Sequence, residues 1–205
     1  MGPESDVEVI GDPAQPAVLL LHPWWGITPA VRWWAEQLVG AGRRVLLPDL
    51  YGGRTADTID GAEALADAMD HAAALRLLER CADQLASEGQ AWAAMGFSLG
   101  AFLACHLASR GAAGPRELVL FYGGQPPEGD DVQTKIVELH VVADDEYFTE
   151  EELTATEVGF RSHGAVVETC RYEGCRHWFA ERDSPAFDEE AAALSLSRVL
   201  ARLGV

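Results

Sequence analysis

A serine between two glycines is the clearest chemical feature of the chain. Residues 96–100 read Gly-Phe-Ser-Leu-Gly, which matches the pattern G-x-S-x-G with Ser98 at its centre. This pattern is typical of a sharp strand-to-helix turn whose strained backbone exposes the serine hydroxyl. An apolar run precedes it at 91–97 and a small-residue helical run follows at 101–109, as the turn requires. Because free N–H groups of the helix N-terminus could also stabilise an oxyanion, Ser98 is the candidate nucleophile.

A serine hydroxyl needs a base to take its proton, so a histidine held by a carboxylate is expected. His177 follows the last predicted strand in a glycine-containing turn, where a loop side chain can reach over the edge of a sheet. His22 ends an early predicted strand, whereas the other histidines are better explained as packing or surface residues: His71 and His106 lie in predicted helices, His140 in a predicted strand, and His163 at a polar helix end. His177 is therefore the candidate base.

The acid of such a site is expected between the serine and the histidine in the chain. Asp144, Asp145 and Glu146 all follow the apolar run at 136–143. The residues themselves offer no decisive physical reason to choose one of them. The stretches of chain from Ser98 to these acidic residues, and from them to His177, are each long enough for a βα unit.

Short apolar runs alternate with helical patterns along the whole chain. Strands are predicted at 17–22, 45–50, 91–97, 118–122, 136–143 and 166–172, and helices at 31–39, 61–85, 101–109, 150–161 and 189–203. Strands that are apolar along their length are typical of a parallel sheet covered by helices on both faces. The fold class is therefore α/β, and the length of 205 residues predicts a single domain at 1–205.

Charge and composition exclude several kinds of partner. The net charge is −18, which predicts repulsion from nucleic acid and from anionic membranes. No apolar stretch is long enough to span a membrane, and the N-terminus shows no signal peptide, so a cytoplasmic protein is expected. The four cysteines are too few for a disulfide scaffold and lack zinc-site spacing. We therefore expect no metal and no cofactor.

Several motifs resemble the dienelactone hydrolase family of α/β-hydrolases, over about residues 17–203. The carrying segments, in the family's order, are LLHPWWG (20–26), PDLYGGRTA (48–56), GFSLGAFLA (96–104), HVVADDEYFT (140–149) and YEGCRHWFAE (172–181). The resemblance implies an α/β-hydrolase fold with a mostly parallel sheet, and it places the acid at Asp145 and the base at His177. The N-terminal part is short for the family, so its first strands are expected to be shortened or missing.

The resemblance also implies the surroundings of the site. The oxyanion would be held by the backbone N–H groups of Leu99 and, in the loop after an early strand, of about Trp24. Four aromatic residues are expected to line the substrate pocket, although core packing explains each of them equally well. They are Trp25, Tyr147, Trp178 and Phe179.

Three residues depart from the family pattern. Ser98 stands where the best-known members carry a cysteine, and Pro23 stands where they carry a glutamate tied to that cysteine's charge state. The absence of the cysteine and the absence of the glutamate agree with each other, because a serine activated by His177 needs no such glutamate. Glu181 stands where an arginine would hold the carboxylate of dienelactone, so a carboxylated lactone is not the expected substrate.

The leading hypothesis is a serine esterase or lactonase that acts on a small ester through an acyl-enzyme. One alternative is a catalytically silent scaffold that binds a ligand or partner, since a fold does not determine function. Another is an acyltransferase or thioesterase with the same triad. The glycines and small residues of 52–70 are compatible with a lid, and an acidic surface with apolar aromatics is compatible with a homodimer.

Overall fold

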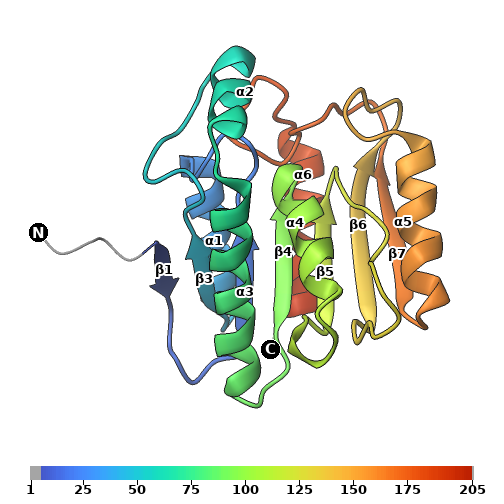
Figure 1. Cartoon of the computed structure of the whole chain (residues 1–205). Helices are drawn as coiled ribbons and strands as arrows, with labels where there is room; N and C mark the ends of the chain where they lie inside the picture. The colour runs from blue at the N-terminus through green and yellow to red at the C-terminus, as the bar shows by residue number, and fades with distance from the viewer. Residues whose placement is uncertain (1–5, 205) are drawn as a thin grey trace, which may run out of the picture.

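A seven-stranded sheet forms the centre of the molecule (Figure 1). The computed structural model describes residues 6–204. The strands are β1 (Val7–Ile10), β2 (Ala17–Leu21), β3 (Arg44–Pro48), β4 (Ala93–Phe97), β5 (Glu117–Phe121), β6 (Ile136–Val142) and β7 (Val166–Tyr172). Their order in the sheet is β1-β3-β2-β4-β5-β6-β7. Only β1 is antiparallel to its neighbour, β3, and the other pairs are parallel.

Helices cover both faces of this sheet, as Figure 1 shows. They are α1 (Pro29–Gly40), α2 (Ile59–Asp67), α3 (His71–Ser87), α4 (Leu99–Ala108), α5 (Glu150–Ser162) and α6 (Glu189–Leu203), with a short 3-10 helix, η1, at Gly111–Ala113. The apolar sides of α3, α4 and α5 pack on one face, and those of α1 and α6 pack on the other. Every residue of β2, β3 and β4 is buried, which explains why these strands are apolar rather than alternating. The predicted α/β-hydrolase architecture is confirmed.

Two details differ from the sequence prediction. The helical run expected over 61–85 is two helices, α2 and α3, because Asp70 ends the run and caps α3 by accepting a hydrogen bond from the Ala73 N–H. Helix α2 lies within 52–70, the segment considered as a lid. The strand β1 was not predicted, since it has only four residues and Val9 is 56% exposed at the sheet edge. No helix in the described range 6–204 is long and apolar enough to cross a membrane.

The chain changes direction across the sheet at β2. From this central strand it runs first to β3 on one side and then crosses to β4 on the other. In open parallel sheets, ligands bind in the crevice at the carboxyl ends of the strands where the winding reverses. The loop after β2 and the turn after β4 meet at this position, and they carry Trp24 and Ser98.

Candidate active site

Ser98 lies at the turn between β4 and α4, where it is the residue preceding the first turn of the helix. Its backbone has φ 48° and ψ −112°, a conformation that residues with side chains rarely adopt. The Ser98 N–H donates to the carbonyl oxygen of Phe121 at 2.9 Å, which ties the strained turn to β5. The serine hydroxyl is thereby held at the carboxyl edge of the sheet.

The flanking glycines are required because the backbone passes too close for any side chain. A Cβ atom on Gly96 would lie 2.2 Å from the carbonyl oxygen of Gly100. A Cβ atom on Gly100 would lie 2.3 Å from the carbonyl oxygen of Leu21 in β2. The G-x-S-x-G pattern is thus the condition for α4 to start this close to the sheet.

The structure brings Ser98, His177 and Asp145 together in one hydrogen-bonded chain. His177 Nε2 lies 3.1 Å from Ser98 Oγ, and His177 Nδ1 lies 2.9 Å and 2.8 Å from the two carboxylate oxygens of Asp145. The side chains of His177 and Asp145 are 3% and 2% exposed. Asp145 Oδ1 also accepts hydrogen bonds from the N–H groups of Tyr147 and Phe148. The neighbouring Asp144 is exposed and makes no hydrogen bond with His177.

Backbone strain in the described chain is concentrated around these three residues. The non-glycine residues with positive φ are Ser98, Tyr122, Asp144 and Trp178. They follow the carboxyl ends of β4, β5, β6 and β7 and are each a triad residue or lie close to one. Such conformations persist where the surrounding structure enforces them, commonly at functional sites.

The loop after β2 carries Trp24 and begins next to the start of α4, where a Cβ atom on Gly100 would lie 2.9 Å from the His22 carbonyl oxygen. Gly26 N–H donates to the Pro23 carbonyl at 3.1 Å, which closes a tight turn over 23–26. His22 is fully buried, with Nδ1 2.7 Å from the Pro23 carbonyl and Nε2 accepting from Leu50 N–H at 3.2 Å. Burial lowers the pKa of His22, so the ring is neutral and links the two loops. Within the described chain, the N–H groups of Trp24 and Leu99 donate to no protein acceptor.

Aromatic rings form a wall next to His177. The rings of Trp24 and Trp178 are stacked at 5.8 Å, and Trp25 meets Trp178 edge-on at 5.1 Å. Tyr147, which is 37% exposed, lies 5.0 Å from the His177 ring and 4.9 Å from Trp178. Phe179 is not part of this wall: it is 0% exposed and packs in the core, which corrects its prediction as a pocket residue.

Sequence reasoning missed the contribution of Tyr122 behind the triad. Its ring lies 4.6 Å from the His177 ring, and its hydroxyl donates to Glu181 Oε1 at 2.6 Å. Glu181 is 1% exposed, and burial raises the pKa of its carboxyl group to about 8. Burial and the nearby Glu181 carboxyl raise the pKa of Tyr122 well above its usual value of 10. The two residues are 59 positions apart, so no short motif could have revealed the pair.

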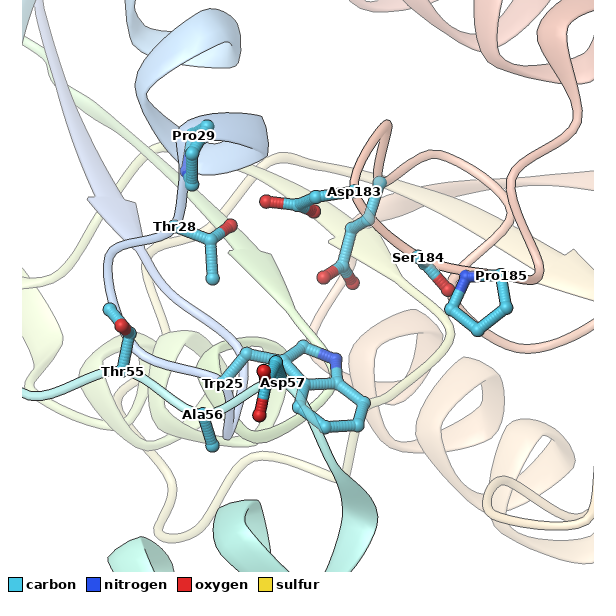
Figure 2. Close-up of a pocket in the computed structure, with 10 residues that line it drawn as sticks. Trp25, Thr28, Pro29, Thr55, Ala56, Asp57, Asp183, Ser184 and Pro185 are labelled. Carbon is cyan, nitrogen blue, oxygen red and sulfur yellow. The ribbon is translucent and has the colours of Figure 1, made fainter.

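A cavity of about 380 Å³ lies between the loops after β2, after β3 and before α6 (Figure 2). Trp25, Thr28, Asp57, Glu181 and Asp183 are among the residues that line it. Ser98 and His177 are not. In Figure 2 the side chains of Thr28 and Asp183 point into the same space.

Comparison with known proteins places this geometry in a family. The model of the dienelactone hydrolase family matches residues 7–204. The chain is 31% identical to carboxymethylenebutenolidase 1 of Cupriavidus pinatubonensis over 208 aligned positions, which cover 93% of this chain and 86% of that protein.

Solved structures show the same fold. A putative dienelactone hydrolase from Klebsiella pneumoniae superposes with a TM-score of 0.75 at 20% identity, covering 95% of this chain and 88% of its own. The dienelactone hydrolase-like promiscuous phosphotriesterase P91, from metagenomic libraries, superposes with a TM-score of 0.77 at 20% identity, covering 96% and 90%. The chain therefore belongs to the dienelactone hydrolase family of α/β-hydrolases and is a carboxylic ester hydrolase.

Proposed function

We propose that the protein cleaves a small carboxylic ester or lactone through an acyl-enzyme formed on Ser98. The observation that carries this proposal is the hydrogen-bonded chain from Ser98 Oγ through His177 to the Asp145 carboxylate. This arrangement is the one in which a neutral imidazole can take the serine proton and a carboxylate can stabilise the resulting imidazolium.

The first half of the reaction forms the acyl-enzyme. Ser98 Oγ attacks the ester carbonyl carbon while His177 Nε2 takes the hydroxyl proton. The carbonyl oxygen becomes an oxyanion that the N–H groups of Trp24 and Leu99 would hold, since neither has an acceptor among residues 6–204. When the tetrahedral intermediate collapses, the C–O bond to the alcohol breaks. His177 gives its proton to the leaving alcohol oxygen.

The second half returns the enzyme to its starting state. A water molecule attacks the acyl carbon while His177 Nε2 takes its proton. The bond to Ser98 Oγ then breaks, His177 protonates that oxygen, and the carboxylic acid leaves. Asp145 remains ionised and keeps Nδ1–H of His177 directed away from the serine, which leaves Nε2 free to act as the base.

The residues around the site favour a substrate without a carboxylate. Trp24, Trp25, Tyr147 and Trp178 would form an apolar aromatic surface for a small acyl or alcohol group. The adjacent cavity is lined by acidic side chains and has no arginine among its lining residues. An anionic lactone would be repelled there.

Turnover of p-nitrophenyl acetate and butyrate tests the proposal. We expect an initial burst of p-nitrophenol equal to the enzyme concentration, followed by slower turnover, as an accumulating acyl-enzyme requires. Adding an alcohol or thiol acceptor measures how much acyl group goes to water and how much to the acceptor. Folded protein that shows neither burst nor turnover would favour the silent scaffold instead.

A further inference from the structure

Two buried polar atoms in residues that line this cavity have no role in the proposed reaction. Glu181 and Thr28 are 1% and 6% exposed, and both line the cavity of Figure 2. Glu181 Oε1 accepts the Tyr122 hydrogen bond, but Glu181 Oε2 and Thr28 Oγ1 are buried with no partner in the described chain. Because a buried polar atom without a partner is destabilising, these two atoms are candidates for contacts with a ligand in the cavity.

The charges around the cavity are all of one sign. Asp183 and Asp57 join Glu181 in the lining, and no lysine or arginine lines it. One oxygen of Asp183 accepts from the Ala30 N–H at 3.1 Å, at the start of α1, so it has a structural role in capping that helix. A concave site lined by one sign of charge concentrates ligands of the opposite charge. The cavity is therefore suited to a cation.

An organic ammonium group fits this arrangement better than a metal ion does. No group of three or more His, Cys, Asp or Glu side chains in the range 6–204 is arranged to hold a metal. An ammonium carries three N–H donors that can turn toward separate acceptors, here a carboxyl oxygen, a hydroxyl and a carboxylate. The ring of Trp25 offers an aromatic wall for the cation, and about 380 Å³ leaves room for an alkyl chain.

We propose that this cavity binds a primary alkylammonium group of the substrate, with Glu181 Oε2 and Thr28 Oγ1 as acceptors. The assignment to a substrate rests on the proposed hydrolase function. Tyr122 contacts both sites, since its ring lies 4.6 Å from the His177 ring and its hydroxyl donates to Glu181. In this proposal the ammonium group, on a short alkyl chain, occupies the cavity while the ester carbonyl lies at Ser98.

Binding is coupled to a proton on Glu181. Burial raises the pKa of the Glu181 carboxyl group to about 8, while the Tyr122 hydrogen bond lowers it and Asp183 raises it further. The Tyr122 hydroxyl stays neutral because its pKa lies well above 10. Asp57 and Asp183 are exposed carboxylates facing the same space. An entering ammonium displaces the Glu181 proton, so affinity should rise by about tenfold or more between about pH 6 and pH 8.

Equilibrium binding of n-butylammonium and n-butanol tests the site by calorimetry. We expect the ammonium to bind wild type more tightly than the alcohol, and to bind Glu181→Gln about tenfold more weakly and without the pH dependence. Thr28→Val should give a smaller loss. The exposed Glu173→Gln, outside this cavity, is the matched control and should bind as wild type does. Equal binding of the two probes, or an unchanged affinity in Glu181→Gln, would overturn the site.

A matched ester pair tests whether the ligand is the substrate. In p-nitrophenyl heptanoate a methyl replaces the ammonium of p-nitrophenyl 6-aminohexanoate at equal chain length. Wild type should favour the amino ester in kcat/KM by about tenfold, and Glu181→Gln should lose that preference. Equal kcat/KM values in wild type would overturn the substrate assignment.

Fluorophosphonate labelling of Ser98 separates this inference from the proposed function. If the fluorophosphonate labels Ser98 but the protein binds n-butylammonium and n-butanol equally tightly, only the assignment of the cavity is contradicted. If the fluorophosphonate does not label Ser98 but n-butylammonium still binds in a manner that depends on Glu181, the proposed hydrolase function is contradicted and the ammonium site is supported.

Discussion

Asp145 contacts His177 with both carboxylate oxygens, at 2.9 Å and 2.8 Å from the same ring nitrogen. The pair is buried, and the N–H groups of Tyr147 and Phe148 donate to the same carboxylate. This network holds the carboxylate in place and directs the Nδ1 proton of His177 toward it. The other ring nitrogen then faces Ser98 as an acceptor.

Asp145→Asn should therefore lower kcat by about 10⁴-fold on p-nitrophenyl acetate, because the amide favours the wrong tautomer of His177. Asp144→Asn is the matched control. It changes the adjacent carboxylate, which is exposed, and asparagine tolerates the φ of 54° found there. Equal losses in the two variants would contradict the assignment of Asp145 as the acid.

Gly100→Ala should destabilise the fold and abolish activity, because its Cβ would lie 2.3 Å from the Leu21 carbonyl oxygen. Relief requires α4 to move away from β2, which would displace Ser98. Gly40→Ala at the end of α1 is the control, since a Cβ there meets nothing within 4 Å. Urea unfolding should show a lower midpoint for Gly100→Ala and an unchanged or slightly higher midpoint for Gly40→Ala. A normal midpoint with full activity in Gly100→Ala would refute the steric argument.

Glu181→Gln should change how stability depends on pH. The folded-state pKa of about 8 lies above the ordinary carboxyl value of 4.5, so the folded state holds a proton that the unfolded state has lost between these values. Wild type therefore loses stability as pH rises from about 5 to 8, and the loss levels off above the folded pKa. Between about pH 5 and pH 8, the unfolding free energy of wild type should therefore fall relative to that of Glu181→Gln, by on the order of a few kcal/mol. A pH-independent difference would show that the carboxyl titrates normally.

Trp34 supports the loop that carries His177. Trp34 belongs to α1 and its side chain is fully buried. Its Nε1–H donates to the Ala180 carbonyl at 3.0 Å. Trp34→Phe leaves that carbonyl without its partner and should cost about 1–3 kcal/mol of unfolding free energy. The adjacent Trp33 is half-buried, and its ring contacts Arg182 and meets the Trp34 ring edge-on, contacts that a phenylalanine ring can partly keep. Trp33→Phe should therefore cost less than about 1 kcal/mol. Denaturant unfolding of both variants measures the contrast, and equal costs would contradict it.

The elements that position the site were predictable because their sequences are simple. Strands such as β2 and β4 are apolar along their length because helices cover both faces, and Ser98 is marked by two glycines that the backbone contacts require. The edge strand β1 carries no such signal, because two of its four residues are exposed. Residue types alone left Asp144 and Asp145 open, since the choice depends on which side chain the loop directs toward His177.

Contacts between distant segments could not be predicted where no motif marks the residues. Tyr122 and Glu181 look like ordinary strand-end and loop residues until β5 and the loop before α6 bring them together. His22 likewise gains its role only through the loops after β2 and β3. The single-domain assignment, the cytoplasmic location and the homodimer stay predictions from the sequence.

Mass spectrometry after incubation with a fluorophosphonate shows whether Ser98 is an activated nucleophile. We expect one adduct per chain, located on Ser98, absent in Ser98→Ala and strongly slowed in His177→Ala. Folded wild-type protein that forms no adduct, or forms one on another residue, would contradict an activated Ser98.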